Sequence, residues 1–114
     1  MHIKQWGIYL VWLDPTQGSE QAGNRPVIVL SGDVMNDEAP VVIVVPLTSK
    51  VKRFFWGLVL EPTKINGLTE TSEAMCSHIR SISKERFKKQ LWSVTHWELN
   101  QLYYQLQIII TTNE

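Results

Sequence analysis

Residues 5–31 read QWGIYLVWLDPTQGSEQAGNRPVIVLS, two apolar runs separated by a polar loop that contains glycines. The first run, Ile8–Leu13, is rich in β-branched and aromatic residues and stops at an aspartate-proline pair, a pattern typical of a strand that ends in a turn. The second run, Val27–Ser31, is almost wholly apolar. We therefore expect two strands and, between them, a loop that can turn sharply and place backbone amides near a ligand.

The middle of the chain continues the strand pattern. Val41–Pro46 is as continuously apolar as Val27–Ser31, so both segments are expected to be buried on two sides rather than one. Further expected elements are a turn over Gly32–Pro40, strands over Phe54–Leu60 and Ala74–Ile82, and a polar loop over Glu61–Thr69.

Near the C-terminus the apolar period changes to steps of three and four residues. This pattern predicts an amphipathic helix, and Thr95 followed by Glu98 has the spacing of a capping box that would start it. Ile108–Ile110 fits either its final turn or a short strand. One helix on a curled antiparallel sheet predicts a single α+β, mostly β domain over residues 1–114, with an SH3-like barrel arrangement. The residues expected on the apolar face of the helix are Val94, Trp97, Leu102, Leu106 and Ile109.

Composition limits the function classes. The formal net charge is zero, and residues 1–49 hold only two basic residues, so any site for a polyanion must be a local patch fed by the second half and Arg25. Cys76 is the only cysteine, which excludes an intrachain disulfide and a cysteine metal cluster and favours a small core residue. No apolar run approaches the roughly 20 residues of a membrane helix, and the N-terminus does not read as a signal peptide. We expect a cytoplasmic protein with no membrane contact.

Several segments, in order and spacing, resemble the MazF/PemK family of toxin endoribonucleases. The matching pieces are IYLV, LDPT, GSEQ-G and RPV-V-S within residues 5–31, then VVPLTSK, the His78–Ile82 segment and Thr95-x-x-Glu98. The resemblance covers nearly the whole chain. It implies an SH3-like barrel, usually a homodimer, that an antitoxin protein holds inactive. It also implies cleavage of single-stranded RNA at short motifs, without a metal or another cofactor.

The resemblance places the key arginine of the family at Arg25 and its key threonine at Thr48, with Glu20 and Gln21 in the loop beside the site. Metal-free RNA cleavage uses the neighbouring 2′-hydroxyl as nucleophile and needs a stabilised phosphorane. The guanidinium of Arg25 suits the phosphate oxygens, and Thr48 can donate one more hydrogen bond. Glu20 fits two roles, a base or an orienting partner. The plainer readings are a salt bridge between Arg25 and Glu20, and a turn at Thr48 that ends a strand.

The residues after Thr48 predict an RNA-binding surface, because single strands are bound by basic grooves and stacking aromatic rings. At least one ring of residues 54–56 is expected to point outward and one inward, and in the plainer reading Phe55 or another ring lies in the core. His78 is a candidate for RNA contact or for proton transfer. The candidate substrate-binding residues are Gln21, Ser49, Lys50, Lys52, Arg53, Phe54, Trp56, His78 and Arg80.

The chain departs from the family pattern in three places. Gln5-Trp6-Gly7 stands where arginine, glycine and an acid are usual, and Ser77 where some relatives have an acid. Trp12 stands where a small polar or acidic residue is common. It lies on the strand face opposite Tyr9, and if that face is outward it fits a dimer or antitoxin contact. These departures leave open a module that binds RNA or an antitoxin without cutting. A gyrase poison of the CcdB type is disfavoured, because the chain lacks the tryptophan-glycine-isoleucine ending of that family.

Overall fold

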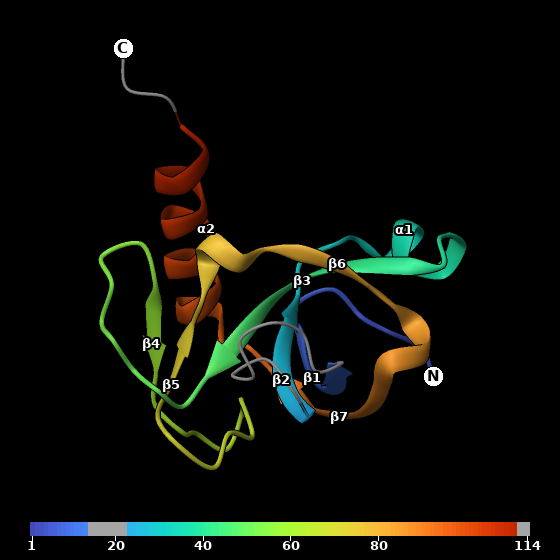
Figure 1. The fold of residues 1–114 in the computed structure, drawn as a ribbon, viewed down its shortest axis with the longest axis horizontal. Coiled ribbons are helices and arrows are strands. Elements are labelled where there is room, and N and C mark those ends of the chain that lie inside the picture. Colours follow the sequence, from blue (N-terminus) through green and yellow to red (C-terminus); the bar gives the residue numbers. More distant parts are fainter. Residues whose placement is uncertain (14–22, 112–114) are drawn as a thin grey trace.

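The computed structural model describes residues 1–13 and 23–111, which form one curled antiparallel sheet with a helix packed on it (Figure 1). Two short 3-10 helices, η2 (Cys76–His78) and η3 (Lys84–Arg86), interrupt the later strands. The strands are β1 (Gly7–Leu13), β2 (Gly23–Val29), β3 (Val41–Thr48), β4 (Leu58–Leu60), β5 (Ser72–Ala74), β6 (Arg80–Ser83) and β7 (Phe87–Ser93), and the α-helices are α1 (Asp33–Glu38) and α2 (His96–Ile110).

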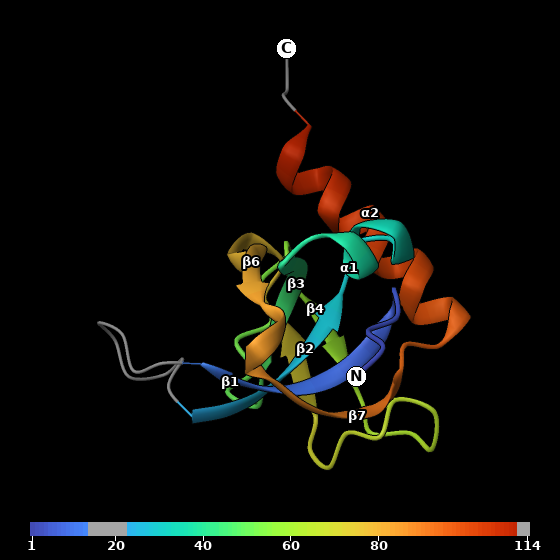
Figure 2. The same cartoon turned by 90° about the vertical axis from the view of Figure 1, so that its right-hand side faces the viewer.

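Six of the seven strands are ordered β4-β5-β3-β2-β1-β7, and the seventh, β6, pairs with β3. Strand β3 is the centre of this arrangement. One of its edges pairs with β2, and its other edge pairs first with β6 and then, near Thr48, with β5. Figure 1 shows α2 beside β4 on one side of the molecule and α1 on the other, and Figure 2 shows β7 running alongside β1. The predicted α+β, mostly β fold with a C-terminal helix is confirmed.

Both faces of the central strands are buried, as their continuous apolar sequence predicts. Val27 and Val29 belong to a cluster inside the curl of the sheet, together with Tyr9 and Val11. Ile28, between them, belongs to a second cluster that includes Leu102 of α2. Alternate side chains of one strand therefore enter different cores, and a polar residue in either set would be buried.

Helix α2 begins where the capping box predicts. The hydroxyl of Thr95 accepts from the N–H of Glu98 at 3.1 Å, and the Glu98 carboxylate accepts from the N–H of Thr95 at 2.8 Å. Ile108–Ile110 belongs to the last turn of the helix, so its helical alternative is correct. The placement of Trp97 on the apolar face is wrong: its side chain is 64% exposed, and Leu99 packs against the core instead.

Four element predictions differ from the structure. The strand expected over 27–31 starts earlier and ends earlier, as β2 (Gly23–Val29). Residues 33–38 of the expected turn form α1, and the expected strand over 74–82 is broken by η2 into the ends of β5 and β6. Only residues 58–60 of the expected strand over 54–60 are in β4. Strand β7 was not expected, because most of its side chains are exposed and only Phe87 is buried, which leaves no alternating apolar pattern to detect.

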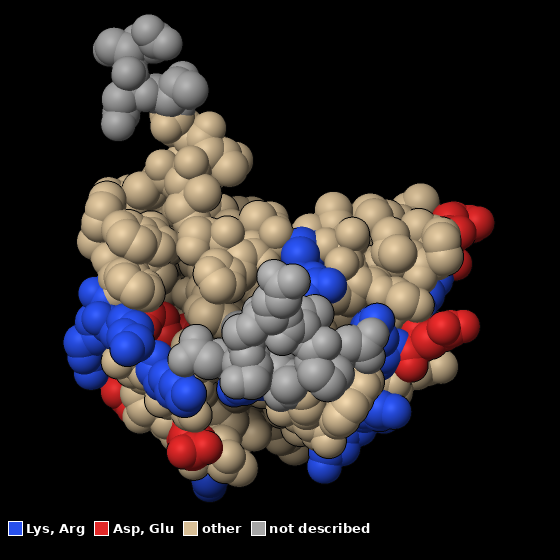
Figure 3. Space-filling view, viewed as in Figure 1, with Lys and Arg blue, Asp and Glu red and all other residues tan. Residues whose placement is uncertain are grey.

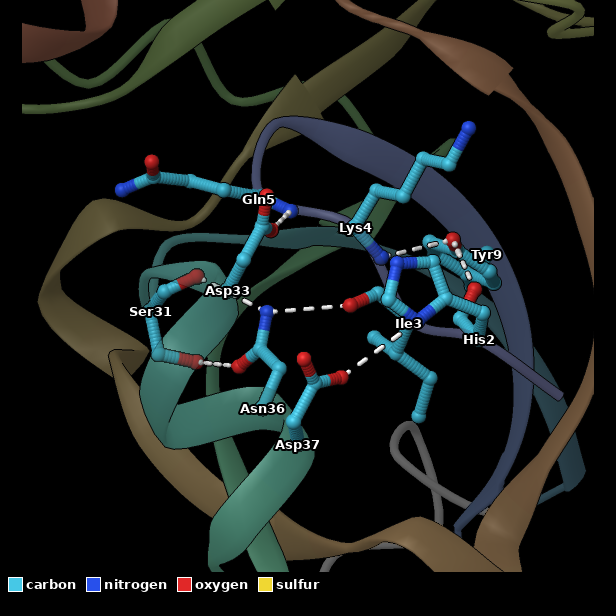
Figure 4. A network of polar contacts seen from close by, with 9 residues as sticks. All are labelled: His2, Ile3, Lys4, Gln5, Tyr9, Ser31, Asp33, Asn36 and Asp37. Carbon is cyan, nitrogen blue, oxygen red and sulfur yellow. Dashed lines mark hydrogen bonds and ion pairs between the residues drawn. The ribbon is translucent and has the colours of Figure 1, made fainter.

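Helix α1 is held by a polar network that also anchors the N-terminal segment (Figure 4). The buried Asn36 donates to the carbonyl oxygens of Ile3, at 3.2 Å, and Ser31, at 2.9 Å, while its own oxygen accepts from the Ser31 hydroxyl. His2 and Asp37 form an ion pair at 3.3 Å. These contacts explain why a segment with turn-forming residues closes into a helix. Within residues 1–13 and 23–111, no helix is long and apolar enough to cross a membrane.

Candidate nucleic-acid interface

Arg25 and Thr48 lie at the same end of two adjacent strands. In the antiparallel register of β2 and β3, Val27 is opposite Pro46. This is the last pair between the two strands, and Arg25 and Thr48 each lie two residues beyond it, at the same end of β2 and β3. The Thr48 hydroxyl oxygen accepts a hydrogen bond from the N–H of Lys50 at 3.1 Å, which leaves the hydroxyl proton able to be donated.

Two pockets meet at this end of β3. The first, which we call the aromatic pocket, has a volume of about 180 Å³ and lies between the segment after β3 and the β5–η2 segment. It brings together six of the residues predicted from the sequence. These are Thr48, Lys50, Lys52, Phe54, Trp56 and His78.

The second, which we call the arginine pocket, has a volume of about 310 Å³ and includes the half-buried Arg25 together with Ser49. Asn24, Glu70 and Lys89 also line it. Because Thr48 and Ser49 are consecutive but line different pockets, the end of β3 forms the boundary between the two. An extended ligand held at Arg25 and Thr48 would therefore reach both.

The rings after β3 form an exposed aromatic group. Phe54 and Trp56 are stacked, with ring centroids 4.8 Å apart and an interplanar angle of 8°, and Phe55 meets Trp56 edge-on at 5.4 Å. Phe54 and Phe55 are exposed and Trp56 is half-buried. The expectation of one inward ring is therefore wrong, because none of the three enters either core cluster. A stacked, partly exposed pair is suited to adding a planar base.

The loop that carries these rings, residues 49–57, is held from two sides. The buried carboxylate of Glu73 in β5 accepts from the backbone N–H groups of Lys52 at 2.7 Å, Arg53 at 2.9 Å and Phe54 at 2.9 Å. From α2, the side-chain amide of Gln105 donates to the carbonyl oxygen of Phe55 at 2.6 Å and to that of Gly57. The loop therefore has a fixed backbone beside Thr48.

Basic side chains gather on the face drawn in Figure 3, along the side where β4 and β5 lie and again near β7. The zero net charge of the chain thus conceals a local concentration of positive charge, as the sequence predicts. Within the described part of the chain, no three His, Cys, Asp or Glu side chains form a group that could hold a metal ion.

Known proteins share the sequence pattern and the fold of this chain. The family model of PemK-like, MazF-like toxins of type II toxin–antitoxin systems matches residues 4–110. The chain belongs to this toxin family. Its fold is also that of solved MazF structures, including MazF from Deinococcus radiodurans at 23% identity (TM-score 0.81, 98% of this chain and 99% of that one). Mycobacterium tuberculosis toxin MazF-mt6 matches at 19% identity (TM-score 0.78, 95% and 99%). A mycobacterial endoribonuclease solved with its cognate antitoxin matches at 18% (TM-score 0.74, 99% and 97%).

Some predicted site residues of this MazF-like chain lie apart from the pockets. Arg80 is exposed on β6, and Arg53 is exposed with a left-handed backbone (φ 59°); neither lines a pocket. Glu20 and Gln21 lie outside the described residues. Trp12 points away from the core and is 41% exposed, as its position in the alternation of β1 predicts.

Sequence reasoning missed Glu73 and Gln105. Glu73 stands in Thr71-Ser72-Glu73, which reads as a polar loop, and Gln105 is an ordinary polar position of an amphipathic helix. Neither has a sequence signal, because their partners are backbone groups some 20 and 50 positions away in the chain. Cys76 is buried as expected, and its burial, together with the charge of Glu73, raises the pKa of its thiol to about 11. It is therefore a structural cysteine and not a nucleophile.

Proposed function

We propose that this MazF-like toxin is a metal-independent endoribonuclease that cuts single-stranded RNA at selected sequences. The observation that carries the proposal is the position of Arg25 and Thr48 at the same end of β2 and β3, where Thr48 lines the aromatic pocket and Arg25 the arginine pocket. The aromatic pocket supplies stacking rings and lysines for unpaired bases and phosphates, and the arginine pocket continues the track.

In the proposed reaction, the 2′-hydroxyl oxygen attacks the adjacent phosphorus and loses its proton. The new bond closes a 2′,3′-cyclic phosphate, and the bond from phosphorus to the 5′-oxygen breaks. That oxygen takes up a proton and leaves as a 5′-hydroxyl, so atoms and charge balance without a metal or another cofactor. The RNA itself supplies the nucleophile.

The guanidinium of Arg25 would pair with the non-bridging oxygens as negative charge develops on them, and the Thr48 hydroxyl would donate one more hydrogen bond. Removing one such donor typically costs about 100- to 1,000-fold in rate. Glu20 and His78 are the candidate groups for the two proton transfers. His78 is exposed at the rim of the aromatic pocket, where it can reach a bound strand.

We further propose a cytoplasmic homodimer that an antitoxin holds inactive by covering this surface. Exposed apolar groups support protein contacts: Trp12 on β1, and a groove of about 360 Å³ formed by Phe55 with Tyr104 and Ile108 of α2. The D. radiodurans relative has been solved as a MazE–MazF complex, and the mycobacterial endoribonuclease with its cognate antitoxin.

The test is incubation of antitoxin-free protein with long single-stranded RNA in EDTA. Wild type should give defined fragments ending in cyclic phosphate, and Arg25→Ala should be slower by about 100-fold or more. Lys4→Ala, which removes an exposed charge at the N-terminal end, should cut like wild type. Intact RNA after incubation with folded wild type would reject cleavage, and a gel shift with that intact RNA would support the binding module instead. Fragmentation that EDTA abolishes would reject metal independence.

A further inference from the structure

On the β5 side, the 49–57 loop is held by a single acidic side chain, Glu73. Glu73 is 1% exposed, and one of its carboxylate oxygens accepts from Lys52 and Arg53 while the other accepts from Phe54. Three backbone donors on one carboxylate form a strong, charge-assisted set. Glu73 borders the aromatic pocket, but its side chain is buried and both carboxylate oxygens accept from backbone N–H groups, so its action is on the loop.

The backbone around Glu73 is shaped to receive this carboxylate. Arg53 adopts φ 59°, which is unusual for a residue with a side chain and needs compensating contacts. Gly57 lies so close that an added Cβ would press on a carboxylate oxygen of Glu73. A glycine at the end of the loop and a strained residue in its middle both fit a loop path determined by Glu73.

Glu73 is also next to the proposed catalytic strand. It is the cross-strand partner of Thr48 in the pairing of β3 with β5. The carboxylate thus connects the end of β3, where Thr48 lies, to Lys52 and Phe54, which line the same pocket. Any change in its hydrogen bonds would move the lysine and the ring relative to Thr48.

We propose that Glu73 is a positioning residue for RNA binding: it fixes the backbone of residues 52–54 so that Lys52 and Phe54 are set toward the RNA bound at Thr48. This inference rests on the proposed function. A glutamate suits this role because an ionised carboxylate is an acceptor only. The amide of glutamine turns one acceptor oxygen into a donor, so at least one of the three N–H groups must lose its partner.

The experiment compares Glu73→Gln with Glu38→Gln, a charge-matched control on α1 at the other end of the molecule. The substrates are a short RNA with one cut site, for KM and kcat, and the same RNA with a 2′-deoxy nucleotide at that site, for equilibrium binding without cleavage. For Glu73→Gln we expect KM and Kd to rise about tenfold and kcat to change less than threefold. For Glu38→Gln both should stay as in wild type.

Two further measurements separate positioning from general destabilisation. Amide hydrogen exchange at Lys52, Arg53 and Phe54 should speed up in Glu73→Gln while exchange in β2 stays slow. Combined with Lys52→Ala, Glu73→Gln should weaken RNA binding by less than the product of the two single effects, because both act through one loop. Gly57→Ala keeps every polar group but its added methyl group presses on the Glu73 carboxylate, so it should also raise Kd. This variant replaces Glu73→Gln in the test if Glu73→Gln does not fold.

Unchanged KM and Kd in a folded Glu73→Gln, with active wild type, would overturn this inference alone. A fall in kcat with KM unchanged, or additive effects with Lys52→Ala, would also overturn it. Wild-type protein that neither binds nor cuts RNA would reject the proposed function and this inference with it.

Discussion

Two loops beside the candidate site are held by buried polar side chains, but in opposite ways. The 49–57 loop is gripped by Glu73, which only accepts hydrogen bonds. The 61–71 loop is built around the fully buried Asn66, which both donates and accepts. Its oxygen takes the N–H groups of Thr63, at 3.0 Å, and Leu68, at 3.1 Å.

The partners of the two side chains explain what each loop serves. The amide nitrogen of Asn66 donates to the carbonyl of Glu61 at 2.8 Å and to the carboxylate of Glu98 at 3.1 Å. Glu98 caps α2, so the 61–71 loop is tied to the helix and its second core. Glu73 is paired with Thr48, so the 49–57 loop is tied to the site. We infer that Asn66 chiefly supports stability, whereas Glu73 chiefly supports binding.

Of the changes that separate the two loops, Asn66→Asp should have the largest effect, and it should act on stability. The variant keeps the acceptor oxygen but replaces the donor that faces Glu98 with a second carboxylate oxygen. Two buried acceptors would then oppose each other, which typically costs several kcal/mol. We expect the free energy of unfolding in urea to fall by about 2–4 kcal/mol.

Adding Glu98→Gln to that variant supplies a new donor and should return about half of the lost stability. A double variant no more stable than Asn66→Asp would show that the contact with Glu98 is not what Asn66 contributes. RNA binding by the folded fraction should change little in either protein, in contrast to Glu73→Gln.

A smaller effect is expected from alanine at the glycine of each loop. Gly67 has φ +65° and an added Cβ would press on the ring of Trp92, so Gly67→Ala should lower the free energy of unfolding by about 1–2 kcal/mol. Gly57 does not have a positive φ angle. Gly57→Ala should therefore lower the stability less than Gly67→Ala does, but it should weaken RNA binding more. Thermal unfolding and a filter-binding assay on both variants give the test; equal losses of affinity would erase the distinction between the loops.

The smallest effect concerns Cys76, which is buried in the second core cluster and feels the charge of Glu73. Burial, and secondarily the Glu73 charge, raise its thiol pKa to about 11, above the ordinary value of about 8.5. The neutral thiol is thus favoured by folding. Its contribution to stability is fully present below about pH 8.5 and is lost as pH rises toward 11.

Alkylation by iodoacetamide should therefore be slow in folded protein at pH 8.5 and accelerate toward pH 11. Glu73→Gln should lower the pKa of Cys76 only in part, because burial is the larger cause. A thiol in the folded protein that reacts as fast as free cysteine at pH 8.5 would contradict this account.

The fold could be predicted where the signal lies in neighbouring residues, as in the repeat of apolar side chains along a strand or the capping box of a helix. The apolar runs of β2 and β3, the outward Trp12 and the start of α2 at Thr95 all follow from neighbouring residues. Strand β7 could not be predicted, because its exposed Lys88 and Lys89 interrupt any alternation of apolar and polar residues. Helix α1 could not be predicted either, because it depends on a hydrogen bond from Asn36 to the distant Ile3.

The candidate site also contains residues that the sequence predicts and one that it does not. The segment from Thr48 to Trp56 is one continuous stretch, so its basic and aromatic residues could be read together and most of them do line one pocket. The resemblance to a family supplied Arg25, which lies at the same end of β2 and β3 as Thr48. The role of Glu73 could not be predicted from the sequence. Its partners are backbone N–H groups, which every residue except proline has, so no particular side chain in the sequence marks the contact.

The attachment of Glu73 to main-chain groups bears on which positions of the loop can vary. Glu73 binds residues 52–54 by their backbone N–H groups, so it places no demand on which side chains residues 52 and 54 carry. Substitutions at these positions can alter the surface offered to RNA while the loop keeps its path. In the proposed function, the RNA preference of this chain can thus change one residue at a time while Glu73 keeps the loop in place.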